Sequence, residues 1–157
     1  MAASTIRPAL RVDLSPSTHW YFEALSTSEI IQVGDLVQVN QSTRKAQLLA
    51  GATVSAGHKF YGISNSYWSS TMNDQQFRNL IEVIGVCIFE VTVASGTYQI
   101  GDALEYDASA GTGRLKSWET GNQLIAWVFE ADTGTITSLK AYMNVFDPSY
   151  NLMESSS

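Results

Sequence analysis

The chain has 157 residues, of which 45% are hydrophobic and only 15% charged, and its formal net charge is −6. This length accommodates one domain with a substantial core and modest tails. The acidic balance and the scattered Lys and Arg residues argue against nucleic acid as a partner, because phosphate binding needs clustered cations. No stretch approaches the roughly 18 uninterrupted apolar residues of a membrane helix, so we expect no membrane partner.

Residues 1–28 are predicted to form an extended N-terminal arm. Pro8 and Pro16 would interrupt a helix or a strand, and no secretory leader is expected because the first residues lack an apolar core segment. The arm is nevertheless too apolar to remain solvated. We therefore expect it to bind the partner or a sister subunit through its apolar and aromatic residues, which are Ile6, Leu10, Val12, Leu14, His19, Trp20, Tyr21 and Phe22.

The aromatic cluster at the end of this arm is the predicted anchor, because large aromatic side chains bury the most area per residue and are enriched at binding hot spots. A different role is open for two of its members. Trp20 and Phe22 could instead plug one end of their own barrel.

Residues 29–146 are predicted to form an all-β body, a small β-barrel (tulip-like) or a sandwich. Short β-rich runs alternate here with Gly, Asn, Ser and Asp clusters, which is typical of such folds. The strands are expected near 35–40, 45–50, 58–64, 79–93, 97–106, 113–118, 123–131 and 135–146. A short, weak helix is expected at 73–78, and residues 147–157 are expected to form a loose C-terminal tail.

One phrase occurs twice in this body. Gln32-Val33-Gly34-Asp35 returns 67 positions later as Gln99-Ile100-Gly101-Asp102, and each copy precedes a short alternating run. Glycine supplies the positive φ that such turns need, and the Asp side chain can accept backbone N–H groups. We interpret Gly34, Asp35, Gly101 and Asp102 as structural turn residues at strand entries, and the two copies as a sign of a pseudo-repeated β domain.

The run 79–93 is apolar on both faces in its middle. A strand with one core face should alternate apolar and polar residues, so this strand is expected to be covered on both sides, within the domain or by a neighbouring subunit. Gly85 is expected to mark a bulge or a sharp bend. Cys87 lies in the same run and is expected to be a buried apolar residue, and its being the single cysteine favours a reducing compartment.

No pattern typical of catalysis or of cofactor binding is present, so we expect no enzyme activity, no cofactor and no metal. The two histidines, His19 and His58, lie in different segments. The spacing of the carboxylates selects no acid pair of the kind that glycoside hydrolysis needs; they are Glu82, Glu90, Asp102, Glu105 and Asp107. Several aromatics could line a sugar-binding platform, although core or interface packing is favoured; they are Tyr67, Trp68, Trp118, Trp127 and Tyr142.

The order of these motifs resembles the capsid cement, or head decoration, proteins of tailed bacteriophages. The shared signatures are a Gly-Asp strand, a Phe-x-Gly-Ile strand at 60–63, a Gly-Val strand at 85–86, and a second Gly-Asp strand with a following tyrosine at 106. A last strand at 124–128 departs from the pattern, because Ala126 stands where the family commonly has glycine. The resemblance covers residues 30–146.

The resemblance implies a non-enzymatic structural protein. Such a protein binds the outer surface of the mature capsid, in the virion, after assembly in the host cytoplasm. Its partners would be the major capsid protein, at joints between neighbouring subunits that it stabilises, and copies of itself, since the family commonly forms homotrimers. The alternative that the sequence leaves open is a phage tail or receptor-binding β module that recognises carbohydrate.

Overall fold

The computed structural model describes residues 18–25, 30–69, 80–110 and 113–150. Its fold is all-β, as predicted from the sequence. The strands are β1 (Thr18–Ala24), β2 (Ile30–Ile31), β3 (Leu36–Asn40), β4 (Lys45–Leu48), β5 (His58–Ser64), β6 (Trp68–Ser69), β7 (Leu80–Gly96), β8 (Ala103–Tyr106), β9 (Leu115–Ser117), β10 (Ala126–Glu130) and β11 (Ile136–Asn144).

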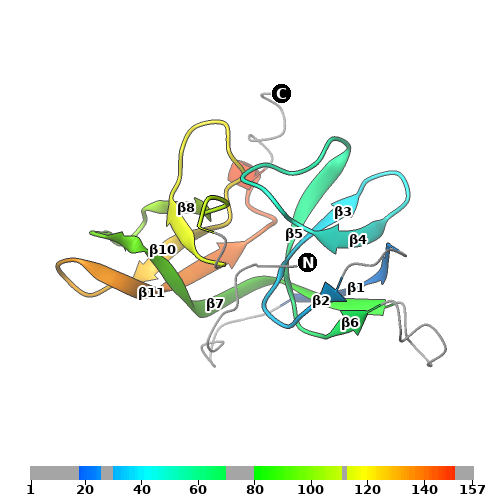
Figure 1. Cartoon of the computed structure of the whole chain (residues 1–157), viewed down its shortest axis with the longest axis horizontal. Helices are drawn as coiled ribbons and strands as arrows, with labels where there is room; N and C mark the ends of the chain where they lie inside the picture. Colours follow the sequence, from blue (N-terminus) through cyan, green and yellow to red (C-terminus); the bar gives the residue numbers. More distant parts are fainter. Residues whose placement is uncertain (1–17, 26–29, 70–79, 111–112, 151–157) are drawn as a thin grey trace.

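The long strand β7 belongs to both of the two closed rings of strands that make up the molecule (Figure 1). The first ring runs β1–β4–β3–β5–β7 and closes where β1 pairs with the first half of β7. The second ring runs β7–β11–β10–β8–β9 and closes where Val93 of β7 lies beside Leu115 of β9. The predicted barrel is therefore the observed architecture, and no sandwich is formed by the described strands.

The two rings repeat the same plan. In each, three consecutive strands (β3, β4, β5 or β8, β9, β10) follow a Gly-Asp turn. The first of the three lies between the other two, and the second runs parallel to the strand that closes the ring. Strand β1 closes the first ring as the second half of β7 closes the second. The short sequence repeat therefore marks a structural repeat that extends over five strands in each ring.

Strand β7 is buried on both faces where the two rings meet, as its sequence predicted. Ile84 and Cys87, 7% and 2% exposed, belong to one buried cluster, whereas Val83, 0% exposed, belongs to another. Gly85 lies between them. A Cβ atom at this position would collide with the indole ring of Trp20 and with the side chain of Val145, so only glycine fits.

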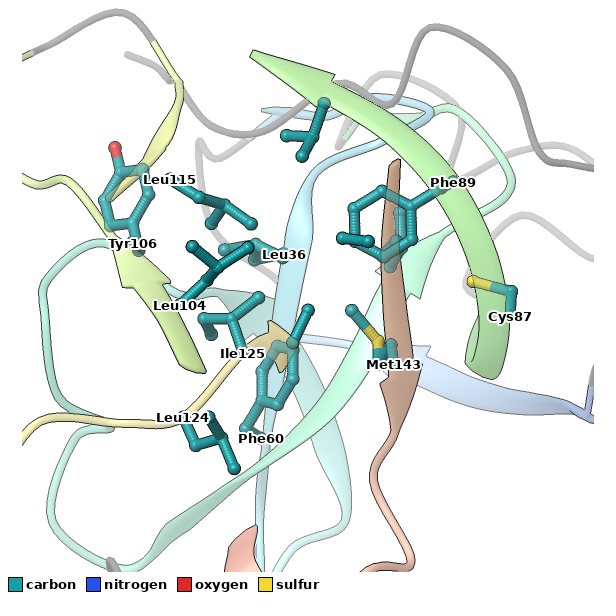
Figure 2. Packing of buried hydrophobic residues seen from close by; sticks show 14 of the residues in the cluster. Leu36, Phe60, Cys87, Phe89, Leu104, Tyr106, Leu115, Leu124, Ile125 and Met143 are labelled. Atoms are coloured by element: carbon teal, nitrogen blue, oxygen red, sulfur yellow. The ribbon is translucent and has the colours of Figure 1, made fainter. Parts of the chain in front are cut away.

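One apolar core connects the rings (Figure 2). Leu36 and Phe60 of the first ring belong to the same buried cluster as Phe89 and Leu104 of the second. A smaller cluster fills the first ring around Val37, Val39, Trp68, Ile81 and Val83. The shared cluster explains why the two rings form one folding unit.

Three sequence predictions need correction or fall outside the described residues. Residues 18–24 were assigned to the arm but form β1 of the first ring, and the small β2–β6 pair was not predicted. Residues 148–150, assigned to the loose tail, form one helical turn, and Tyr150 is 2% exposed. Residues 1–17, 73–78 and 151–157 lie outside the described part of the chain, and with them Ile6, Leu10, Val12 and Leu14.

Candidate functional site

The two Gly-Asp turns have the structural role predicted for them. Gly34 and Gly101 have φ angles of 96° and 94°. The Asp35 carboxylate accepts the N–H of Gln32 at 2.8 Å, and the Asp102 carboxylate accepts the N–H of Gln99 at 2.9 Å. Both Asp side chains thus bind the backbone of their own turns, which confirms the interpretation as strand-entry residues.

Between Gln and Gly, each turn presents an apolar residue at its tip. Val33 is 55% exposed and Ile100 is 75% exposed. Residues at these two positions are equivalent in the repeat, so the rings carry a matched pair of apolar tips. Beside Val33, a cavity of about 210 Å³ is lined in part by Ile63, Ile84 and Phe89, together with Ser64 and Asn65.

Alternation along β1 divides the predicted aromatic anchor. Trp20 and Phe22 lie opposite Val83 and Ile81, which face the inside of the first ring. Both pack within their own chain: Trp20 is edge-on to Phe146 at 5.0 Å between ring centroids, and Phe22 is edge-on to Tyr61 at 5.0 Å. This is the alternative that the sequence left open. His19 lies opposite Ile84 in the strand pairing.

The third aromatic side chain of this cluster, Tyr21, points outward. Tyr21 is 66% exposed and lies opposite Glu82 of β7, and Leu80, two residues away on the same face, is 42% exposed. We call Tyr21 and Leu80 the β1–β7 patch. Partner binding by the anchor stays a prediction, and within it Tyr21 offers the largest exposed surface of the three aromatics whose burial is described.

On the outer face of the second ring, half-buried residues form a row that crosses four strands and ends just after β9. Strand register places Ile88 opposite Tyr142, Tyr142 opposite Trp127, and Trp127 opposite Ala103. Trp118 extends the row, because its backbone N–H donates to the carbonyl of Ala103. The Trp127 and Tyr142 rings stack at 6.2 Å between centroids with 27° between their planes. We call these five residues the aromatic row.

This row brings together only part of the predicted sugar platform. Trp118, Trp127 and Tyr142 share one face, whereas Trp68 is 1% exposed in the core of the first ring and Tyr67 is exposed elsewhere. The indole N–H of Trp118 donates to the carbonyl of Asn122 at 2.9 Å. On the other side, Tyr150 packs edge-on against Trp127 and donates its hydroxyl to the carbonyl of Ile125. Burial raises the pKa of this hydroxyl.

A polar row lies directly beside the aromatic row. Lys140 is opposite both Glu90 and Glu130. Glu90 lies two residues along β7 from Ile88, and Lys140 lies two residues along β11 from Tyr142. Glu130 lies three residues along β10 from Trp127. The ammonium of Lys140 is 3.0 Å from the Glu130 carboxylate, and a hydrogen bond and the charge of Glu130 raise the pKa of Lys140. A cavity of about 290 Å³ is lined by Glu90, Glu130 and Lys140, together with Ala131, Asp132, Ser138 and Leu139.

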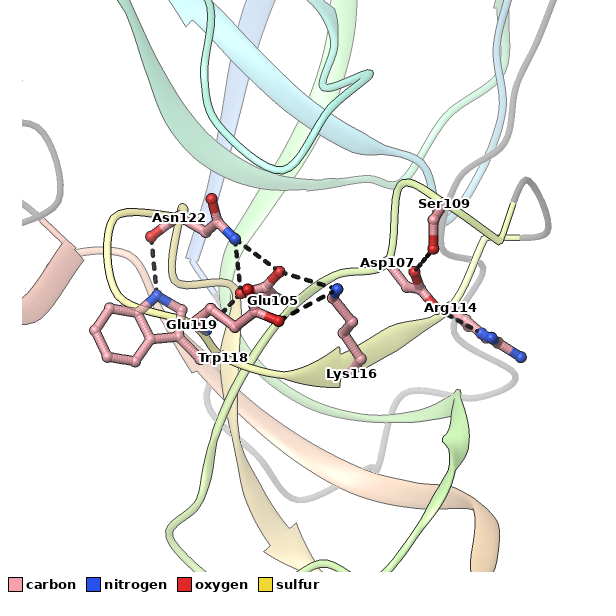
Figure 3. A network of polar contacts seen from close by, with 8 residues as sticks. All are labelled: Glu105, Asp107, Ser109, Arg114, Lys116, Trp118, Glu119 and Asn122. Carbon is pink, nitrogen blue, oxygen red and sulfur yellow. Dashed lines mark hydrogen bonds and ion pairs between the residues drawn. The ribbon is translucent and has the colours of Figure 1, made fainter.

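The remaining acids of the second ring are structural (Figure 3). Glu105 has no exposed side-chain surface; it accepts the backbone N–H of Glu119 at 2.6 Å and both of its oxygens accept the amide of Asn122. Lys116 lies 3.8 Å from the same carboxylate. This arrangement fixes the loop after β9, so Glu105 has no oxygen pointed at a substrate-sized space.

Asp107 is held in the same way at the end of β8. Arg114 Nε donates to one carboxylate oxygen at 2.8 Å and the Ser109 hydroxyl donates to the other at 2.7 Å. Burial tends to raise the pKa of this carboxyl, but the hydrogen bonds and the Arg114 charge outweigh it and lower the pKa below its usual value. Asp107 is therefore not poised as a proton donor near neutral pH.

Other candidates for chemistry are dispersed. His58 binds the backbone at Ala56, Cys87 is buried, and no group of three or more His, Cys, Asp and Glu residues that could hold a metal occurs among the described residues. In that same part of the chain, no helix has the length and apolar content to cross a membrane.

The chain matches no protein-family model and no curated protein. The strand register that creates the aromatic and polar rows was the information missing from the sequence. The local sequence signal for the rows was the alternation of Ile88 with Glu90 and of Lys140 with Tyr142.

Proposed function

We propose that this protein is a non-enzymatic structural protein of the virion that binds the outer surface of a tailed-phage capsid. Its partners are the major capsid protein and sister copies, arranged as a homotrimer, and it stabilises joints between neighbouring capsid subunits. The observation that carries the proposal is the β1–β7 patch, in which the exposed Tyr21 and Leu80 lie opposite Glu82 and Glu23 on the outer face of a closed ring of strands.

The geometry of this patch supports docking. Tyr21 and Leu80 lie on paired strands, so neither side chain needs a change of backbone to meet a partner. Large exposed aromatics on a rigid frame bury area at little cost in conformational entropy. Full burial of the two side chains would contribute several kcal/mol at about 25 cal/mol per Å². Binding of three linked copies would multiply this effect through avidity.

The repeat supports the same proposal. Val33 and Ile100 present equivalent apolar tips from the two rings. Two equivalent tips suit a partner surface that itself repeats, as the surface of a shell built from copies of one protein does. The resemblance of residues 30–146 to capsid cement proteins agrees with this role.

Binding to capsids that lack the protein tests the proposal. Purified wild-type protein should saturate such capsids and raise their melting temperature. The Tyr21→Ser, Leu80→Ser double variant should bind at least tenfold more weakly while its own melting temperature stays within error of the wild type. Phe129→Ser, which removes an aromatic ring exposed on the other ring of strands, is the matched control. Absence of binding by the wild-type protein would contradict the proposal.

A further inference from the structure

We infer that the outer face of the second ring is a carbohydrate-binding site for neutral or amine-bearing oligosaccharides. The site combines the aromatic row with the polar row formed by Glu90, Lys140 and Glu130. It is separate from the β1–β7 patch, which lies on the first ring.

The aromatic row provides a stacking surface. One face of a pyranose ring carries C–H groups that pack on an aromatic ring, and Trp127, Tyr142 and Trp118 offer such rings along one line across the sheet. Three steps between neighbouring strands, at ~4.8 Å each, separate Trp118 from Tyr142. This span exceeds the length of one sugar ring, so an oligosaccharide fits it better than a monosaccharide.

The polar row provides partners for hydroxyl groups. Two residues along a strand correspond to about 6.8 Å, so the carboxylates and the ammonium lie within reach of a sugar stacked on the aromatic row. Carboxylates accept from hydroxyls, and Lys140 donates to them. The cavity of about 290 Å³ beside Glu90, Glu130 and Lys140 gives a substituent room to enter. Aromatic surface with a few convergent polar groups is typical of small-ligand sites.

Charge selects the class of sugar. Glu90, Glu130 and Asp132 outnumber Lys140 at the cavity, so the local charge is negative. An anionic polysaccharide or a nucleic acid would be repelled, and an amine would be attracted. A protein partner is less suited to this face, because the row residues are half-buried, unlike the protruding Tyr21 or Ile100, and would bury less area.

Calorimetry and tryptophan fluorescence with three tetrasaccharides test the site: cellotetraose as a neutral probe, chitosan tetramer as an amine-bearing probe, and a galacturonate tetramer as an anionic probe. The full chain should bind at least one of the first two and should not bind the third. Tyr142→Ala and the isosteric Glu90→Gln should each weaken binding at least tenfold. Tyr67→Ala, which removes a 53% exposed aromatic ring away from both rows, should bind as the wild type does.

Tyr142→Ala can also disturb packing, since Tyr142 stacks on Trp127, so its fold is checked by circular dichroism and the result is judged together with Glu90→Gln. Failure of the wild type to bind either cellotetraose or chitosan tetramer at millimolar concentration would overturn the inference. Unchanged binding by Glu90→Gln and Tyr142→Ala would overturn it as well. Capsid binding by Glu90→Gln should remain at wild-type level, which separates this site from the proposed capsid contact.

Discussion

The two rings share one arrangement of strands, but each fixes an equivalent loop with a different buried side chain. We call these side chains, Gln38 and Glu105, the loop anchors. In the first, the Gln38 amide donates to the carbonyl of Leu48 and to Ser55, and accepts the Ser55 N–H. In the second, the residue 67 positions later is Glu105, and its carboxylate binds Glu119 and, again 17 positions on, Asn122. A carboxamide and a carboxylate thus both fix the loop that follows β4 or β9.

The outer faces of the rings differ much more than their frames. The first ring exposes Tyr21 and Leu80, whereas the second lays half-buried aromatics beside a charged row. The comparison indicates that turns and buried anchors maintain the fold, and that the outward positions are free to acquire separate binding roles.

The largest expected difference in stability is between alanine substitutions at two glycines of positive φ, Gly62 and Gly101. Gly62 in the first ring has φ of 132°, and an added Cβ would collide with the carbonyl of Ile84, while Gly101 in the second has φ of 94° and open space around it. Gly62→Ala should cost at least about 3 kcal/mol, because strain and a backbone clash combine, and Gly101→Ala should cost about 1 kcal/mol. Urea unfolding measures both, and equal losses would contradict the described packing.

Exchanging the side-chain types of the loop anchors, Gln38 and Glu105, is expected to have the next largest effect on stability. Gln38→Glu would bury a carboxylate against the Leu48 carbonyl and should cost about 3 kcal/mol, because burial disfavours an ionised group without a cation. Glu105→Gln keeps the shape and should cost about 1–2 kcal/mol, whereas Glu105→Ala leaves buried donors unpaired and should cost more. A Glu105→Gln variant less stable than Glu105→Ala would show that the two anchors are not equivalent.

A smaller difference between the rings is expected in how stability depends on low pH, because equivalent positions hold Asn40 and Asp107. Asn40 ends β3 and accepts the N–H groups of Ser42 and Thr43, while its equivalent Asp107, directly after β8, titrates. Because folding lowers the pKa of Asp107, its stabilising effect is complete above the unfolded pKa of about 3.9 and is lost as pH falls through the folded pKa. Asp107→Asn should therefore flatten the acid limb of a stability profile, and an unchanged limb would argue against the Arg114 pairing.

The smallest effects are expected at a matched pair of exposed ion pairs. Lys45 is 3.1 Å from Glu23 in the first ring, and Lys140 is 3.0 Å from Glu130 in the second. Solvent screens such pairs, so Lys45→Met and Lys140→Met should leave the melting temperature within error. A clear loss for Lys140→Met alone would mean that the polar row has a structural role.

Sequence alone located the repeat and the strands β3, β4, β5, β8, β9 and β10, because the Gly-Asp turns and the alternating runs are local signals. It missed β1, since three successive aromatics hide the alternation that turns Trp20 and Phe22 inward and Tyr21 outward. Tyr150 was missed because a single aromatic in a polar tail carries no periodic signal. The aromatic and polar rows depend on the register between strands distant in sequence, such as Trp127 with Tyr142, which no local pattern contains.

The central proposal is tested most directly by the position and copy number of this protein in purified virions of a tailed phage whose genome carries its gene. Cryo-electron microscopy should show the two-ring body on the outer capsid surface as trimers, in the high copy number of a component bound at every equivalent joint, with the β1–β7 patch facing a capsid or sister subunit. A few copies confined to the tail, or no copies in the virion, would contradict the proposal.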